Sequence, residues 1–151
     1  MLGDAAVAVH PDDPRYQHLI GKFATHPVDG RRIPIVADPE LVDMELGTGA
    51  VKVTPAHDPN DLLCGRRHNL PEVSIFSDTG VLTDAVAPEY VGLTRFQART
   101  KLVEQLTELG LYRGCEPHTM ALGVCSRSGD ILEPMLKPQV HEVVVCIVDG
   151  Y

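Results

Sequence analysis

The chain has 151 residues, of which 44% are hydrophobic and 23% charged, and these proportions favour one globular domain over a disordered chain. The formal net charge of −8 excludes a protein that grips duplex nucleic acid by electrostatics alone, because such binders carry a basic surplus. The four cysteines lack C-x-x-C spacing and there is no apolar run of about 18 residues, which argues against structural zinc, secretion and a membrane segment.

Short strands joined by turns are predicted for the first third of the chain. Ala5–Val9 is typical of a buried strand, and Arg15–Ile20 is long enough for one helical turn. The Asp29-Gly30 pair is a turn signal. It precedes a second predicted strand, Ile33–Val36, in which Pro34 indicates an edge strand or the start of one.

A strand followed by a capped helix is predicted in the middle of the chain. Gly47–Thr54 alternates small, β-branched and polar residues, as a strand through a tight site would. Asp58 can cap a helix that has Pro59 at its first position and Asp61 at its third. We expect this helix to end near His68.

Two hairpins are predicted in the second half of the chain. In the first, Val73–Phe76 and Val81–Leu82 flank the turn signal at 77–80. In the second, Met120–Cys125 and Ile131–Leu136 flank the turn at 127–130. A last strand is predicted at Val143–Val148.

The clearest helix covers Arg95–Leu109. Thr94 can cap it, Gln97 stands at the reciprocal capping-box position, and Gly110 follows its last apolar residue. One face is apolar and is expected to pack on a sheet: Leu102, Val103, Leu106 and Leu109. Many short strands with few helices predict a mainly β fold, in the form of a β-barrel with peripheral helices.

Chemistry-bearing side chains are concentrated between Gly47 and Asp61. Lys52 and Thr54 would point to the same face of a strand, because side chains repeat every two residues. Asp58 and Asp61 would lie in the first turn of the helix, where the helix dipole favours their ionised forms. Such carboxylates suit a ligand ammonium group, and glycines allow a ligand to approach the backbone closely.

Spacing alone favours a purely structural role for each of these residues. Asp58 could be only a helix cap, worth about 1 kcal/mol, and Asp61 could only complement the helix dipole. Lys52 could be a solvated strand residue and Thr54 a β-former. His57 is more often a packed, hydrogen-bonded histidine than a catalytic base.

Gly47–Asp61, with its Lys52-Val53-Thr54-Pro55-Ala56-His57-Asp58 run, closely resembles the editing-domain signature of the valine–tRNA ligase family, among the class I aminoacyl-tRNA synthetases. Further segments resemble the same domain, namely Met1-Leu2-Gly3-Asp4 with Ala6–Pro11, Arg67-His68, Gly92–Phe96, Gly110–Gly114, Cys125–Asp130 with Glu133-Pro134, and Lys137-Pro138-Gln139. The resemblance covers residues 1–139 and implies the β-barrel of the valyl, isoleucyl and leucyl editing domains.

The resemblance implies hydrolysis of threonine wrongly attached to valine tRNA. Lys52, Thr54 and Asp58 would bind the threonine side chain, and Asp61 would hold the ammonium group. The substrate-binding residues would include Gly47, Thr48 and Gly49, and Asp58 and Asp61 would be the catalytic residues. No metal or cofactor is expected here, since ATP and magnesium would belong to a separate catalytic domain. The partners would be the 3′ end of valine tRNA and the rest of the synthetase, without a membrane.

Both ends of the chain depart from the family pattern. The threonine-rich segment that precedes Met1 in the family is absent, and residues 140–151 match nothing in the family. We therefore expect an editing domain at 1–139, cut at its N-terminal side, and a divergent tail. Two alternatives to a fragment of the ligase stay open: a free-standing deacylase, and a non-catalytic module that binds a tRNA end or a protein. The expected location is cytoplasmic, with mitochondria as the alternative.

Overall fold

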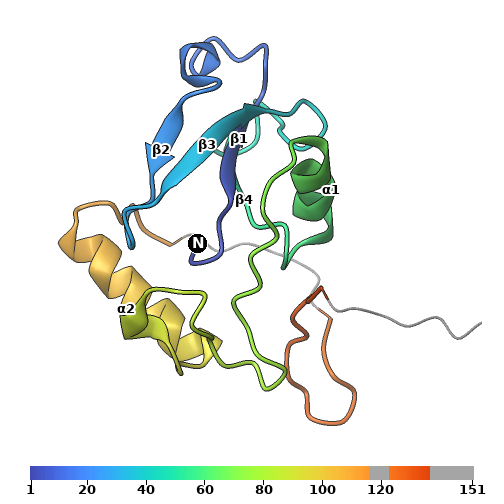
Figure 1. Cartoon of the computed structure of the whole chain (residues 1–151), viewed down its shortest axis with the longest axis vertical. Coiled ribbons are helices and arrows are strands. Elements are labelled where there is room, and N and C mark those ends of the chain that lie inside the picture. Colours follow the sequence, from blue (N-terminus) through green and yellow to red (C-terminus); the bar gives the residue numbers. More distant parts are fainter. Residues whose placement is uncertain (116–122, 137–151) are drawn as a thin grey trace, which may run out of the picture.

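The computed structural model describes residues 1–115 and 123–136. It contains a four-stranded sheet, in the order β2-β3-β1-β4, which lies in the upper part of the view in Figure 1. β1 is an inner strand that runs parallel to β3 and antiparallel to β4. The strands are short: β1 (Ala6–Val9), β2 (Phe23–Thr25), β3 (Arg32–Ala37) and β4 (Ala50–Val53). A one-turn 3-10 helix, η1 (Gln17–Leu19), stands where the sequence predicted a helical turn.

The hairpin between β2 and β3 confirms the predicted Asp-Gly turn. Gly30 has a φ of 71°, a conformation that glycine adopts without a steric cost. Of the two placements expected for Pro34, an edge strand or the start of a strand, the edge is wrong, because β3 lies between β2 and β1. The amide of Ile35 donates to the carbonyl of Lys22, just before β2. The amide of Asp38 donates to the carbonyl of Val9 in β1. Backbone amides along a strand point alternately to its two neighbours, so the nitrogen of Pro34 faces β1. Pro34 stands just before the first pair of β1 and β3, Val7 with Ile35, so no hydrogen bond between these two strands is lost.

Helix α1 (Pro59–Arg67) forms where the sequence predicted a capped helix, and it packs on the sheet. Asp58 accepts hydrogen bonds from the amides of Asn60 and Asp61, and His68 ends the helix. Pro55 lies against Gly65 of this helix, and a Cβ at Gly65 would come within 2.8 Å of the proline ring. The buried cluster beneath the helix consists of Ala6, Ala8, Val42, Val53 and Cys64.

Asp38 fixes the C-terminal end of α1. Its carboxylate is 1% exposed and accepts hydrogen bonds from the amides of Glu40 and Leu41 and from the Arg67 guanidinium. His68 Nε2 lies 3.1 Å from the same carboxylate. Burial raises the pKa of Asp38, but hydrogen bonds from Cys64 and Arg67 outweigh it and lower the pKa to about 2.

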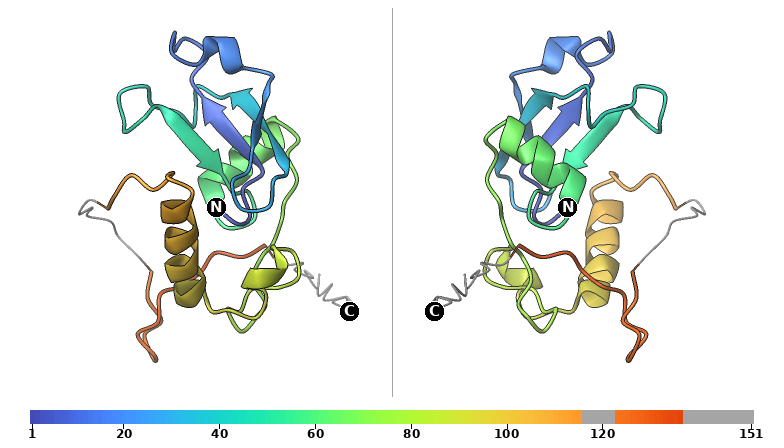
Figure 2. Two further views of the ribbon diagram at one scale, coloured as in Figure 1. Left: turned by 90° about the vertical axis from the view of Figure 1, so that its left-hand side faces the viewer. Right: turned by 90° about the vertical axis from the view of Figure 1, so that its right-hand side faces the viewer.

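Helix α2 (Arg95–Glu108) has the predicted capping box between Thr94 and Gln97. Its predicted packing on the sheet is wrong. Within the helix only Ala98 is buried, and it joins a second cluster built from loops and the 3-10 helix η2 (Pro88–Tyr90). That cluster contains Leu2, Ile75, Leu82, Val86, Tyr90 and Ala98. Leu102 packs partly against it, whereas Leu109 is 52% exposed, because loops rather than strands face the helix (Figure 2).

The two predicted hairpins form, each with a single isolated bridge. Phe76 pairs with Leu82, and Val124 pairs with Ile131. Residues 120–122 and the predicted strand Val143–Val148 lie outside the described residues. The mainly β class is confirmed, but the strands described form an open sheet, so the closed barrel stays a prediction. Within the described ranges, no helix has the length and apolar character that a membrane span requires.

Candidate functional site

A pocket of about 310 Å³ opens where the end of β4 and the start of α1 face α2. Three residues singled out from the sequence line it together: Lys52, Thr54 and Asp58. The rest of the wall comes from the start of the chain, from the 75–82 segment, from α2 and from the second hairpin: Met1, Leu2, Gly3, His57, Ile75, Phe76, Leu82, Arg95, Ala98, Arg99, Leu102 and Glu133. These three predicted residues therefore share one hollow.

Lys52 and Thr54 lie on the same face of the chain, as the two-residue period of a strand requires. Lys52 Nζ donates a hydrogen bond of 3.0 Å to Thr54 Oγ1. The same ammonium lies 3.8 Å from the carboxylate of Asp61. Lys52 is exposed while Thr54 and Asp61 are buried, so an exposed cation stands over a buried polar floor.

Asp61 lies behind the pocket rather than in its wall. It is 6% exposed, and its Oδ2 accepts a 2.8 Å hydrogen bond from the amide of Thr54. Burial raises the pKa of Asp61, while the Thr54 amide and the Lys52 charge oppose that rise. The carboxylates of Asp58 and Asp4 raise the pKa further. The prediction from the helix dipole alone left out this burial.

Asp58 combines the structural role and the location that the sequence suggested. Its Oδ1 caps α1 by accepting from the amides of Asn60, at 2.8 Å, and Asp61, at 3.0 Å. The residue is exposed and lines the pocket. Its second oxygen has no hydrogen-bond partner among residues 1–115 and 123–136, so it can accept from a ligand.

Gly47, Thr48 and Gly49 lie at the opposite end of β4, outside this pocket. Gly49 has a φ of 73°, and a Cβ there would stand 2.5 Å from Arg15 Nη2. The hydroxyl of Tyr16 donates to the carbonyl of Thr48 at 2.8 Å. The close approach at Gly49 is therefore made by a side chain of this protein, and a substrate-binding role for the three residues stays a prediction.

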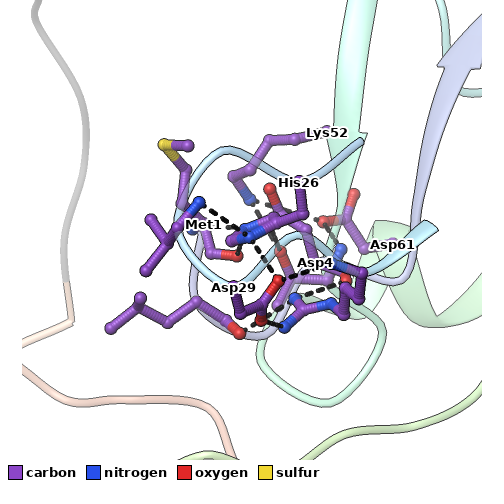
Figure 3. A network of polar contacts seen from close by, with 10 residues as sticks. Met1, Asp4, His26, Asp29, Lys52 and Asp61 are labelled. Atoms are coloured by element: carbon purple, nitrogen blue, oxygen red, sulfur yellow. Dashed lines mark hydrogen bonds and ion pairs between the residues drawn. The ribbon is translucent and has the colours of Figure 1, made fainter. Parts of the chain in front are cut away.

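Asp4 belongs to the site although sequence reasoning gave it no role. It is buried, and its Oδ1 accepts a 2.9 Å hydrogen bond from Thr54 Oγ1 (Figure 3). The two residues are 50 positions apart and meet because β1 pairs with β4. The one available signal was the place of Asp4 just before a buried strand, within the opening segment that resembles the family.

His57 joins three segments around the pocket. Its Nε2 accepts from the amide of Ile75 at 3.0 Å, so Nδ1 carries the proton and donates to the carbonyl of Pro134 at 3.1 Å. Its ring meets Phe76 edge-on, with centroids 5.2 Å apart. Both ring nitrogens are engaged, which agrees with the packed, hydrogen-bonded role expected from the sequence.

One cluster with metal-ligand chemistry occurs among the described residues, away from the pocket. The ligand atoms of Asp38, Cys64 and His68 lie within 4.8 Å of one another. Arg67 already places its guanidinium on both Asp38 oxygens, and burial together with the Asp38 hydrogen bond raises the pKa of Cys64 to about 12. A thiol that stays protonated beside a guanidinium is a poor ligand set, so these residues fit a structural network better than a metal.

Comparisons with known proteins agree on one family. The family model described as leucyl-tRNA synthetase, editing domain, matches residues 13–101. The mitochondrial valine–tRNA ligase of Saccharomyces cerevisiae is 58% identical over 139 residues, which is 92% of this chain and 13% of that protein. The valine–tRNA ligases of Rattus norvegicus and Geobacillus stearothermophilus are 54% and 52% identical, again over 92% of this chain but 11% and 16% of their own lengths. The chain thus spans only a small part of the length of the relatives it matches.

Proposed function

This chain belongs to the leucyl-tRNA synthetase editing-domain family, and from that membership we propose that it carries the hydrolytic editing site of a valine–tRNA ligase. The substrate would be threonine esterified to the 3′ end of valine tRNA. The observation that carries the proposal is the joint placement of Lys52, Thr54 and Asp58 around one pocket, with Asp61 directly behind them.

The need for such a site follows from the similarity of two amino acids. Threonine and valine have nearly the same shape, and an apolar pocket rejects the added hydroxyl only about 100-fold, a value established for enzymes of this kind. A second pocket lined by polar groups selects in the opposite sense. Valine would leave Lys52 and Thr54 without the hydrogen bonds that a β-hydroxyl supplies, and each such hydrogen bond contributes about 0.5–1.5 kcal/mol.

The charges around the pocket suit the end of an RNA strand despite the acidic balance of the whole chain. Lys52, Arg95 and Arg99 all line the pocket, against the carboxylates of Asp58 and Glu133. Arg95 is held by the carbonyl of Ile131 at 2.8 Å. Cations that line the pocket attract phosphates, while Asp58 is available for the ammonium group of the amino acid and the buried Asp61 adds negative charge behind it.

The reaction would be attack of water on the ester carbon, with the ribose hydroxyl of the tRNA as leaving group. Positioning of the aminoacyl group and electrostatic stabilisation of the developing oxyanion are the contributions that this geometry can make. Lys52 is the cation nearest to the polar floor and would carry the second of these roles. Asp58 and Asp61 would orient the substrate through its ammonium group.

A deacylation assay tests the proposal. The purified chain is mixed with valine tRNA that carries radiolabelled threonine, and release of threonine is followed. We expect release above the spontaneous rate, its loss in Asp61→Ala, and no change in Asp43→Ala, where the residue is exposed and lies outside the pocket. A rate equal to spontaneous hydrolysis would contradict a catalytic role.

The non-catalytic alternative is separated by a second readout. Binding of a threonyl analogue with an amide in place of the ester, without turnover of the ester, would identify a module that binds the tRNA end. Relatives named as mitochondrial and relatives without that label match about equally well. A cytoplasmic location of the whole protein therefore stays a prediction.

A further inference from the structure

We infer that Asp4 is a positioning residue that fixes the Thr54 hydroxyl as a hydrogen-bond acceptor, so that the pocket selects a β-substituent that donates a hydrogen bond. The inference rests on the proposed function and adds a specificity determinant to it. It starts from three polar contacts that meet at Thr54, whose partners Lys52, Asp61 and Asp4 are labelled in Figure 3.

The direction of each contact follows from the chemistry of the groups. A hydroxyl has one hydrogen and two lone pairs. The carboxylate of Asp4 can only accept, so Thr54 donates its single hydrogen to Asp4 Oδ1 at 2.9 Å. The ammonium of Lys52 can only donate, so it occupies one lone pair of Thr54 Oγ1 at 3.0 Å. One lone pair is left, and Thr54 can offer a ligand only an acceptor.

The Lys52 ammonium supplies a hydrogen-bond donor beside the acceptor that Thr54 offers. It has three hydrogens, of which one is donated to Thr54 Oγ1, while the Asp61 carboxylate, 3.8 Å away, is an ion-pair partner beyond hydrogen-bond distance. A hydrogen is left for a ligand. A β-hydroxyl can therefore donate to Thr54 while it accepts from Lys52. A methyl group does neither, and a fluorine atom in the same place accepts weakly without donating.

The main chain around Asp4 is held by groups outside the pocket, and the Met1 ammonium lies 3.4 Å from the Asp4 carboxylate. The carbonyls of Leu2 and Asp4 accept hydrogen bonds from Arg31 Nη2 at 3.0 Å and 2.9 Å, and His26 Nε2 lies 3.2 Å from the carbonyl of Met1. The carboxylate of Asp29 pairs with both His26 and Arg31.

Gly3 lets this first segment lie against Thr54, since a Cβ at Gly3 would come within 3.3 Å of Thr54 Cγ2. The hairpin between β2 and β3 thus holds the main chain that carries Asp4. The Asp4 carboxylate is itself buried and accepts from Thr54 at 2.9 Å, which suits it to act as a fixed acceptor.

Binding of three analogues to the wild-type chain tests the inference without any mutation. Each is 3′-amino-3′-deoxyadenosine acylated by threonine, by 2-amino-3-fluorobutyrate of the same configuration, or by valine, and affinities are measured by calorimetry. We expect the hydroxyl compound to bind about tenfold more tightly than the fluoro compound, the value of one hydrogen bond. The fluoro and valyl compounds should bind about equally.

Variants then assign the donor preference to Asp4. In Asp4→Ala the Thr54 hydroxyl is free to turn and donate to fluorine, so the preference should fall to about threefold. Thr54→Ser keeps the hydroxyl and should keep the preference. Asp38→Asn removes a buried carboxylate outside the pocket and should leave the preference at the wild-type value. A loss of stability alone would weaken the binding of all three compounds equally and leave the ratio of their affinities unchanged.

The possible results distinguish a failure of the proposed function from a failure of the inference about Asp4. Binding of none of the analogues would overturn the proposed function and this inference with it. Tighter binding of the threonyl than the valyl compound, with the fluoro compound binding as tightly as the threonyl one, would leave the proposed function standing and overturn the inference. An unchanged preference in a folded Asp4→Ala chain would also overturn the role of Asp4.

Discussion

Replacing Asp38 by asparagine tests how much the Asp38 carboxylate stabilises the C-terminal end of α1. The first turn of this helix carries Asp61, and its cap is Asp58. The pKa of Asp38 falls from 3.8 to about 2 in the folded chain, a difference equivalent to about 2 kcal/mol of unfolding free energy. Arg67 is 33% exposed and therefore screened by solvent, so we expect about 1–2 kcal/mol. The substituted amide would keep the shape of the side chain but lose the charge that Arg67 and the two backbone amides favour.

The sign of the effect follows from the lowered pKa. The stabilisation is fully present above the ordinary carboxyl pKa of 3.8 and disappears as the pH falls through about 2. Urea denaturation of wild type and Asp38→Asn should therefore differ most near neutral pH, with the ionic part of the difference shrinking below about pH 4. Asp43→Asn, at an exposed position, is the control and should shift little. Parallel stability curves for wild type and Asp38→Asn across that range would refute the reasoning.

Three further predictions follow from single sites. Gly49→Ala should destabilise the chain by about 1–3 kcal/mol, because φ is 73° and the new Cβ would meet Arg15; unchanged thermal unfolding would contradict this. Deacylation should decline as the pH falls toward the raised pKa of Asp61, because the proposed role needs the ionised form; a flat profile from about pH 7 to about pH 4 would argue against that role. A thiol reagent near pH 8 should label Cys125, whose pKa is lowered by hydrogen bonds from Ser128, well before the buried Cys64, whose pKa is about 12; equal rates by mass spectrometry would show that Cys64 is accessible.

Elements specified by neighbouring residues were predictable from the sequence. The caps of α1 and α2 depend on residues within one turn, and Asp58 and the Thr94–Gln97 pair act as expected. The Gly30 turn is equally local. The shared pocket of Lys52, Thr54 and Asp58 followed from the two-residue period of a strand and a capped helix just after it.

Features that depend on distant partners were not predictable in the same way. The inner position of β3 depends on parallel pairing with β1, and no local signal specifies that pairing. The apolar face of α2 meets Ile75 and Leu82 instead of strands, which periodicity cannot distinguish. Asp4 meets Thr54 only because β1 and β4 are neighbours, and the burial that raises the pKa of Asp61 is likewise a product of the tertiary fold.

The central claim is that Lys52 and Thr54 bind a β-hydroxyl in a pocket that edits valine tRNA. The most direct measurement is the ratio of the rates at which the chain releases threonine and valine from that tRNA, for wild type and for Lys52→Met. We predict that wild type releases threonine at least about tenfold faster than valine, and that Lys52→Met loses most of this preference. Equal release of both amino acids by wild type, or an unchanged ratio in Lys52→Met, would contradict the account.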